Sequence, residues 1–156
     1  MADDPTLHAT AILIGAKAVL IRGPSGSGKS SLAWDLIQAA SAGTAALPFA
    51  RLVGDDRIHV DVRAGRLLVR PAQALAGLIE IRGLGIRRLP YEAVAVAGLV
   101  VDLAAADAGR LPAREAAETA ISGLILPRLA VAAGQDPVPL VLAWLGTGLG
   151  VNPAAN

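Results

Sequence analysis

Eight consecutive residues, 23–30, match the pattern G-x-x-x-x-G-K-[ST] at every fixed position. Glycine lets the backbone turn where other residues are sterically excluded, so that successive N–H groups can point inward around a phosphate. Lys29 offers a compact positive charge to the β- and γ-phosphates, and Ser30 offers a hydroxyl to Mg²⁺. The pattern therefore predicts a nucleoside triphosphate site formed by Gly23, Pro24, Ser25, Gly26, Ser27, Gly28, Lys29, Ser30 and Ser31.

The residues on both sides of this segment favour that interpretation. Residues 18–21 are apolar β-formers that predict a strand, and residues 31–37 carry apolar side chains at helical spacing. A helix directly after the loop adds the positive end of its dipole to the phosphate site. The alternative is a glycine-rich turn that binds nothing, and it leaves both the flanking elements and the Lys-Ser pair unexplained.

Two adjacent carboxylates, Asp55 and Asp56, follow the short apolar stretch 51–54. The C-terminal ends of parallel strands meet at the ligand-binding edge of a sheet, so a strand here would bring these carboxylates close to the loop. A carboxylate at that place suits a group that accepts and returns a proton during phosphoryl transfer. The alternative is a solvated acidic turn, and the residues alone support the two interpretations about equally.

Two further acids are candidates for holding a metal. Glu80 lies within the apolar stretch 79–86, where a carboxylate is unfavourable unless it is paired or bound to a metal. Arg82 follows two residues later, on the same face of a strand, so a structural Glu–Arg pair at a sheet edge is the alternative. Asp102 closes the apolar stretch 98–102, the arrangement of the second metal anchor in many phosphate-loop enzymes.

Two basic side chains complete the candidates. His8 precedes the first expected strand, where a solvated histidine is the usual case. Arg128 follows Pro127 in an apolar neighbourhood, and a guanidinium can bind phosphate or carboxylate through two parallel hydrogen bonds. A surface arginine without a ligand is the alternative for Arg128.

The remaining periodic segments predict strands and helices that would position these residues. A hairpin over 57–62 and 67–70 is expected to flank the nucleotide site, and a loop or single helical turn is expected over 71–76. The other expected elements are strands at 9–14, 17–21, 51–54 and 95–103, a helix from the loop to about residue 42, a helix start at 112–118, a strand at 124–131 broken at Pro127, and a final helix at 137–145.

The composition bounds the class of protein. The chain has 156 residues, which favours one domain, and its apolar fraction of 54% with only 3% aromatics predicts a core of Ala, Val, Leu and Ile. The net charge of +1 gives no sign of a nucleic-acid or membrane partner, and the lack of cysteine excludes disulfides and thiolate metal sites. A cytoplasmic enzyme is expected, with a flexible lead-in at 1–7, a catalytic domain at 8–146 and a flexible tail at 147–156.

These residues together resemble the catalytic domain of the HPr kinase/phosphorylase family, in the short form found in α-proteobacteria. The resemblance runs over about residues 8–131 and includes the family signature E-I-R-G-L-G at 80–85. It implies a phosphate-loop kinase fold related to phosphoenolpyruvate carboxykinase, with a mixed sheet and flanking helices. The features that carry it are His8, the loop 23–30, Val53-Gly54-Asp55-Asp56 and the segment 79–86.

The resemblance also implies an activity. Members transfer the γ-phosphoryl group of ATP to a serine of HPr, a phosphocarrier of the sugar phosphotransferase system, and run the reverse attack of inorganic phosphate on the phosphoserine. Members are hexamers, so a homo-oligomer is expected. By position, Asp55 would be the proton acceptor, and His8 and Asp56 would support it. Ser30 and Glu80 would lie at Mg²⁺.

Three further positions take their roles from the same resemblance. Arg82 would anchor the signature near the phosphates, and Arg128 would meet the phosphate of the target. Asp102 would be structural, which reverses the role that the residues alone suggest for it. Two other functions remain open from the sequence: a kinase for a small hydroxylated metabolite, and a nucleotide-binding sensor that has lost phosphoryl transfer.

Overall fold

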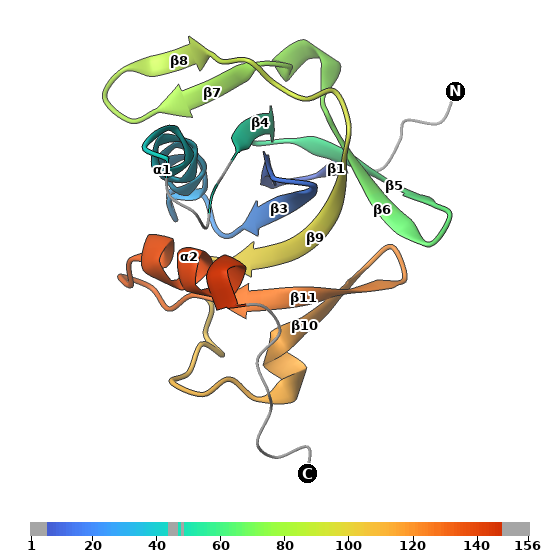
Figure 1. Ribbon diagram of the computed structural model, residues 1–156, viewed down its shortest axis with the longest axis vertical. Helices are drawn as coiled ribbons and strands as arrows, with labels where there is room; N and C mark the ends of the chain where they lie inside the picture. The colour runs from blue at the N-terminus through green and yellow to red at the C-terminus, as the bar shows by residue number, and fades with distance from the viewer. Residues whose placement is uncertain (1–5, 44–46, 48, 148–156) are drawn as a thin grey trace.

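The computed structural model describes residues 6–43, 47 and 49–147 (Figure 1). In this part of the chain, two α-helices accompany one branched mixed sheet and one two-stranded sheet, which is an α/β arrangement. Short 3₁₀ turns lie at Gln73–Leu75 and Arg114–Ala117. The helices and strands are β1 (Thr6–Leu7), β2 (Thr10–Ile14), β3 (Lys17–Arg22), α1 (Lys29–Ser41), β4 (Ala50–Gly54), β5 (Ile58–Arg63), β6 (Arg66–Pro71), β7 (Leu78–Ile81), β8 (Gly85–Arg88), β9 (Ala95–Asp102), β10 (Glu118–Ile121), β11 (Leu124–Ala130) and α2 (Pro137–Thr147).

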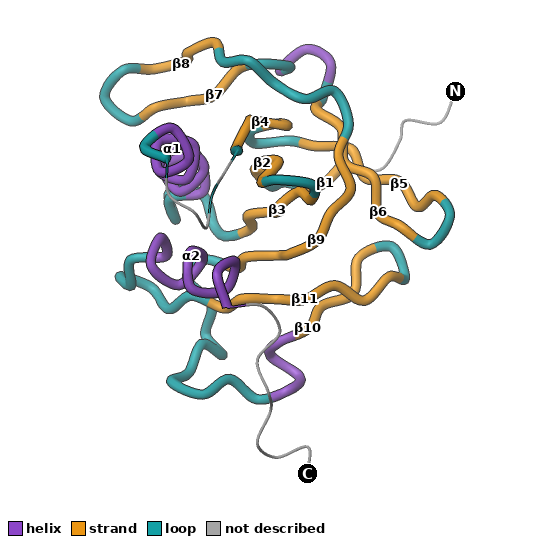
Figure 2. The backbone as a smooth tube through the Cα atoms, in the orientation of Figure 1, coloured by secondary structure: helices purple, strands orange, loops and turns teal. Residues whose placement is uncertain are grey.

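A mixed sheet forms the body of the fold, in the order β1-β5-β6-β9-β3-β2-β4. Strand β9 lies at its centre and pairs in parallel with β3 along one edge. Along its other edge, β9 pairs antiparallel with β6 at residues 95–96 and parallel with β11 at residues 100–102. The sheet therefore divides along β9, and β11 with its hairpin partner β10 forms a separate branch (Figure 2).

Both faces of the sheet are packed, which explains why its central strands are almost wholly apolar. In β3, Val19 and Ile21 contribute to a core that includes side chains of α1 and α2. The alternate residues Ala18 and Leu20 contribute to a second core, on the opposite face, with strands β5, β6, β10 and β11. Figure 1 shows α1 and α2 together on one side of β3 and β9.

The hairpin of β7 and β8 forms its own two-stranded sheet and packs over α1 (Figure 1). Ile79 is 1% exposed and belongs to the same core as Leu32 and Leu36 of α1. Strand β8 is exposed along its whole length. The hairpin is thus anchored by one apolar edge, while its turn stays free to border the phosphate loop.

Most of the expected elements are present, including the first hairpin, the helix after the loop, the central strand and the final helix. The expected helix at 112–118 is wrong, since residues 114–117 form one 3₁₀ turn and residues 118–121 extend into β10. Thr119 and Ile121 there pair with Leu126 and Leu124, and this sheet pairing outweighs the local helical signal.

The expected break at Pro127 is also wrong, because β11 runs through it from Leu124 to Ala130. Proline lacks a donor, but the parallel pairing of β11 with β9 begins only at Arg128. Strand β1 places Thr6 and Leu7 beside β5, within the segment expected as a lead-in. The division into lead-in, catalytic domain and tail stays a prediction, and residues 1–5 and 148–156 lie outside the described residues.

Candidate active site

The phosphate loop follows β3 and leads directly into α1. Gly26 and Gly28 have φ values of 79° and 99°, a region that favours glycine. Gly23 is required for a different reason, because a Cβ there would lie 2.5 Å from Oγ of Ser27. The amide of Ser27 donates to the carbonyl of Pro24 at 3.0 Å, which closes the loop on itself. The loop therefore has the backbone geometry that the sequence pattern predicts.

Lys29 is held over this loop. Its side chain is 8% exposed, and its Nζ donates to the carbonyl oxygens of Gly23 at 2.9 Å and Pro24 at 3.1 Å. Lys29 also lines the cavity in front of the loop, together with Ser25, Gly26 and Gly28. A positive charge fixed beside a glycine loop at the start of a helix is an arrangement that binds phosphate.

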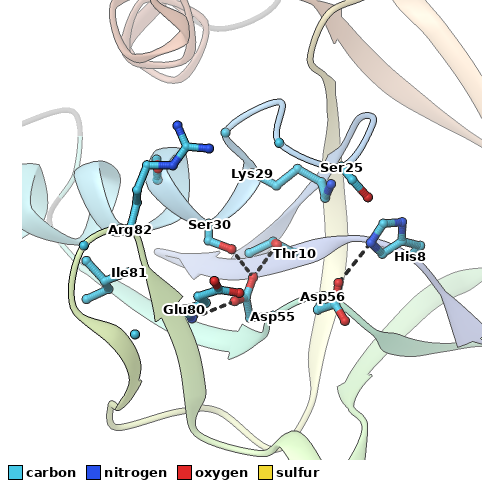
Figure 3. Close-up of a pocket in the computed structure, with 15 residues that line it drawn as sticks. His8, Thr10, Ser25, Lys29, Ser30, Asp55, Asp56, Glu80, Ile81 and Arg82 are labelled. Carbon is cyan, nitrogen blue, oxygen red and sulfur yellow. Dashed lines mark hydrogen bonds and ion pairs between the residues drawn. The ribbon is translucent and has the colours of Figure 1, made fainter.

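Asp55 lies at the centre of the site, and its carboxylate is fixed by three donors (Figure 3). Thr10 Oγ1 donates to its Oδ1 at 2.7 Å, and Ser30 Oγ donates to the same oxygen at 2.6 Å. The backbone N–H of Glu80 donates to its Oδ2 at 3.1 Å. Asp55 is 6% exposed, so three separate segments meet at one buried carboxylate.

The topology explains this meeting. Strand β4 pairs antiparallel with β2, and β2 pairs antiparallel with β3, so β4 and β3 run in the same direction. Their C-terminal ends, which carry Asp55 and the phosphate loop, therefore lie at one edge of the sheet. Thr10 reaches the same edge because it begins the oppositely directed β2.

Thr10 is a site residue that the sequence reasoning missed. It is fully buried within an otherwise apolar strand, and a buried hydroxyl needs a partner. A polar residue inside the apolar stretch 9–14 was the available signal. That signal could not identify the hydrogen-bond partner of Thr10, because Asp55 lies 45 residues further along the sequence.

His8 and Asp56 form a pair at the rim of the site. Nε2 of His8 lies 3.0 Å from Oδ1 of Asp56, and their side chains are 50% and 67% exposed. Asp56 has a φ of 69°, a backbone conformation that turns it away from Asp55. The two adjacent acids therefore have different surroundings: Asp55 is buried among donors, and Asp56 meets a histidine in solvent.

The β7–β8 hairpin supplies the remaining wall. Glu80, Ile81, Arg82, Gly83 and Gly85 all line the cavity in front of the loop. Among the described residues, no ion pair joins Glu80 to Arg82, so the structural pair considered from sequence does not form. Both side chains are exposed toward the site, as Figure 3 shows for Arg82 beside the loop.

One cavity of about 460 Å³ connects these groups. Strand β2, the loop, the end of β4 and the β7–β8 hairpin all contribute to its wall. The β5–β6 hairpin, expected beside the nucleotide, contributes no residue. The lining residues are His8, Thr10, Ser25, Gly26, Gly28, Lys29, Ser30, Ser31, Asp55, Asp56, Glu80, Ile81, Arg82, Gly83 and Gly85.

Arg128 lies elsewhere, in a network of ion pairs. Its Nε donates to Asp102 at 2.5 Å, and its NH1 and NH2 donate to Asp107 at 2.7 and 3.0 Å. Arg22 donates to both oxygens of Asp102 at 2.7 and 2.8 Å. Arg128 is not among the residues that line the cavity. Its guanidinium binds two carboxylates of its own chain.

This network shifts the ionisation of its members. Burial raises the pKa of the Asp102 carboxyl, but hydrogen bonds and positive charge from Arg22 and Arg128 outweigh it and hold that pKa below its ordinary value. The hydrogen bond from Arg128 lowers the pKa of Asp107, and the same two carboxylates raise the pKa of Arg128. Asp102 is thus a structural ion-pair partner, as the family resemblance implies.

The donor set in the cavity fits Mg²⁺, which takes oxygen ligands and usually keeps several waters beside one or two carboxylates and substrate phosphates. The Ser30 hydroxyl donates a hydrogen bond to Asp55, so the lone pairs of its oxygen remain available to a metal. Glu80 adds an exposed carboxylate to the same wall. The described residues contain no cluster of three acidic or histidine ligands, which a site completed by phosphates and water does not require.

The loop, its lysine and the carboxylate joined to Ser30 define a phosphate-loop α/β domain. A family model described as the HPr serine kinase C-terminal domain matches residues 1–90, more than half of the chain. The chain therefore belongs to this family. The fold class expected from sequence, a mixed sheet with flanking helices, is confirmed.

Curated relatives carry the same family name. The chain is 38% identical over 87 residues to the HPr kinase/phosphorylase of Streptococcus thermophilus, which is 55% of this chain and 25% of that protein. It is 34% identical over 86 residues to that of Clostridium beijerinckii, which is 55% of this chain and 26% of the relative. The chain thus spans about a quarter of the length of the curated relatives it matches.

A solved structure extends the likeness of fold beyond residue 90. The HPr(Ser) kinase/phosphatase of Coxiella burnetii matches with a TM-score of 0.73 and 22% identity, over 92% of this chain and 89% of that one. The likeness of fold therefore covers more of the chain than the family model matches. In the described part of the chain, no helix has the length and apolar character needed to cross a membrane.

Proposed function

We propose that this chain transfers the γ-phosphoryl group of ATP to a serine hydroxyl of an HPr-like phosphocarrier protein. The family membership and the names of the relatives support the reaction class. The observation that carries the proposal is the buried carboxylate of Asp55, joined to Ser30 of the phosphate loop at 2.6 Å. Asp55 would act as the proton acceptor, next to the place where the loop would hold a γ-phosphate.

The loop would hold the phosphates while Asp55 handles the proton. Phosphoryl transfer depends mainly on positioning and on charge stabilisation. The loop amides and Lys29 would therefore contribute most, by orienting the phosphates and stabilising their negative charge. Lys29 would exchange the carbonyls of Gly23 and Pro24 for phosphate oxygens. Arg82, exposed on the cavity wall, would add positive charge from the opposite side.

The two oxygens of Asp55 would have different roles. Oδ1 accepts from both Thr10 and Ser30, so its two lone pairs are engaged. Among the described residues, Oδ2 accepts only the backbone N–H of Glu80, which leaves it one lone pair. The acceptor serine would therefore give its proton to Oδ2. In the reverse direction, the same oxygen would return the proton as inorganic phosphate takes the phosphoryl group and forms pyrophosphate.

Ser30 and Glu80 would hold Mg²⁺, which would supply positive charge to the β- and γ-phosphate oxygens. His8 and Asp56 would support the rim of the site, where a protein substrate enters. Their pairing at 3.0 Å joins two side chains on the wall of the cavity that Asp55 also lines. Arg128, bound by Asp102 and Asp107, has no part in this proposal.

The same proposal includes the extent of the catalytic unit, its location, its assembly and its substrates. The catalytic unit would comprise residues 8–146, act in the cytoplasm and assemble as a homo-oligomer. Its substrates would be ATP, the carrier protein and, for the reverse reaction, inorganic phosphate. A small hydroxylated metabolite is the competing acceptor, and the same cavity would serve it.

The test is a transfer assay with the organism's own HPr and γ-labelled ATP, run in parallel with a set of hydroxylated metabolites. Label on a phosphoserine of HPr, with pyrophosphate release after phosphate is added, is the expected result. Label on a metabolite with none on HPr would replace the proposal by the metabolite kinase. Nucleotide binding without transfer to any acceptor would favour a sensor.

A further inference from the structure

Residues 82–88 form an unbroken exposed stretch at the edge of the cavity. The stretch begins in the turn after β7 and includes the whole of β8, and every one of its residues is exposed. Among the described strands, β8 is the only one without a buried or half-buried residue. It pairs with β7 alone. Figure 1 shows this hairpin at the top of the molecule, apart from the main sheet.

Two large apolar side chains in this stretch are exposed to solvent. Leu84 is 60% exposed and Ile86 is 66% exposed. Single apolar residues on a surface are normal, but these two are close together in sequence and lie beside a cavity that contains catalytic groups. Their apolar area leaves water only if a partner covers it.

Ile86 lies next to the cavity without lining it. In the register of the hairpin, Ile86 is directly opposite Glu80. Directly opposed residues of antiparallel strands have their side chains on the same face, with Cβ atoms about 4.5–5.5 Å apart. Glu80 lines the cavity and Ile86 does not. A small acceptor inside the cavity therefore need not touch Ile86, whereas a protein that inserts a serine must lie across the rim that carries it.

The same stretch is basic. It contains Arg82, Arg87 and Arg88 and no acid, and none of these three has an ion-pair partner among the described residues. Arg22 and Arg128, by contrast, each bind a carboxylate of the chain. Residues 57–88 hold seven of the 14 Lys and Arg residues but two of the 13 Asp and Glu residues. Positive charge therefore gathers on the hairpins β5–β6 and β7–β8, although the net charge of the chain is only +1.

This composition fits a protein better than a nucleic acid. An apolar centre with a polar rim, enriched in arginine, is typical of protein interfaces. Sites for single-stranded nucleic acid combine basic groups with aromatic side chains that stack on the bases, and residues 57–88 contain no Phe, Tyr or Trp. The expected partner is a polypeptide with apolar side chains beside its serine and acidic groups around them.

We propose that residues 84–88 are the docking surface for the acceptor protein. Leu84 and Ile86 contact apolar side chains next to the acceptor serine, and Arg87 and Arg88 meet acidic groups further from it. The proposal rests on the proposed function, because it assumes that the acceptor is a protein. It also explains how this chain would select a protein over a free hydroxyl compound, since these contacts lie outside the cavity.

Ile86→Ser tests the apolar part of the surface in a steady-state transfer assay with HPr. We expect kcat/KM for HPr to fall about tenfold through a higher KM, while kcat and the Kd for ATP stay within about twofold. Ile125→Ser is the matched control, because Ile125 is 64% exposed on β11 and does not line the cavity. An unchanged kcat/KM in Ile86→Ser, or an equal loss in Ile125→Ser, would overturn the proposal.

The double variant Arg87→Glu/Arg88→Glu tests the charged part. At about 50 mM KCl we expect kcat/KM for HPr to fall at least about tenfold, with a weaker dependence on salt up to about 300 mM than in wild type, because salt screens exposed charges. Arg110→Glu/Arg114→Glu is the control with the same change of charge at exposed positions outside the cavity. The same loss in both double variants would mean that only the net charge matters and would refute the docking surface.

Two further measurements identify a different occupant. A lower molar mass of Ile86→Ser in light scattering, with normal transfer to HPr, would make the surface a contact between copies of this chain. Loss of binding to a labelled RNA of about 20 nucleotides in Arg87→Glu/Arg88→Glu, again with normal transfer, would assign it to nucleic acid. Either result overturns docking of the acceptor and leaves the proposed function intact. A wild-type protein that transfers no phosphoryl group to HPr would instead end the proposed function and the docking surface together.

Discussion

The hydroxyl of Ser30 donates a 2.6 Å hydrogen bond to Oδ1 of Asp55 and thereby joins the phosphate loop to the end of β4. The two residues are 25 positions apart in sequence and approach each other because β3 and β4 end at the same edge of the sheet. In the proposed function, Ser30 would hold phosphate and metal, and Asp55 would accept a proton.

Thr10 should act as a positioning residue for Asp55. Thr10→Val keeps the shape of the side chain but removes the 2.7 Å hydrogen bond to Oδ1. A hydrogen bond to a charged group contributes about 1.5–3 kcal/mol, so we expect kcat to fall about tenfold or more. The KM for ATP should stay within about twofold, and Thr10→Ser should restore the rate. Unchanged kcat in Thr10→Val would show that Ser30 and Glu80 alone fix Asp55.

Gly23 should be needed for the shape of the phosphate loop. A Cβ at this position would meet Ser27 Oγ at 2.5 Å and Leu103 Cβ at 3.1 Å, so Gly23→Ala must displace the loop. We expect the affinity for ATP, measured by calorimetry, to fall at least about tenfold. Gly65→Ala, in an open turn at a φ of 73°, is the control. It should cost about 1 kcal/mol of stability and leave ATP affinity unchanged.

Asp102 should stabilise the fold in a pH-dependent way. Arg22 and Arg128 hold the pKa of its carboxyl below the ordinary value of 3.8 despite its burial. A depressed folded-state pKa adds stability that is complete above 3.8 and is lost as the pH falls through the folded-state pKa. Asp102→Asn should therefore be destabilised by about 2–4 kcal/mol at pH 7, with a smaller loss of stability than wild type below pH 4. Urea denaturation at pH 7 and at pH 3 measures both effects, and equal pH dependence in the two proteins would contradict the assignment.

Arg128 should affect stability rather than phosphoryl transfer. Its guanidinium is held by Asp102 and Asp107, and its side chain is 13% exposed. Arg128→Ala leaves these carboxylates without a partner and should lower the free energy of unfolding by about 2–4 kcal/mol. The transfer rate per folded molecule should stay within about threefold. A large loss of transfer in a variant of normal stability would instead assign Arg128 to the phosphate of the target.

The sequence predicted the central part of the site well, because that part is local. The loop 23–30 lies between a strand and a helix that the spacing of apolar residues predicts. Asp55 follows a short strand, as expected. The family signature placed Glu80 and Arg82 beside the loop, and both line the cavity. The loop and the strand before Asp55 depend on neighbouring residues, which patterns of sequence describe. The place of Glu80 and Arg82 beside the loop is not local and followed from the family resemblance.

The features that the sequence missed depend on contacts between distant segments. The bond from Thr10 to Asp55 needs the register of β2 against β4, including its irregularity at Ala11 and Ile12. The cavity between the phosphate loop and residues 131–137 forms because β11 pairs with β9. No local pattern in residues 124–137 predicts that pairing. The extended conformation of 118–121 likewise comes from pairing with β11 and not from its own helical signal.

Single-turnover transfer by Asp55→Asn tests the central claim most directly, with ATP affinity measured on the same sample. Asparagine keeps the size of the side chain and its contacts with Thr10 and Ser30 can largely persist, but it cannot accept the serine proton. We expect ATP to bind within about threefold of wild type and the transfer rate to fall by about 10²–10⁴. Transfer to the carrier at the wild-type rate, with normal ATP binding, would contradict the account.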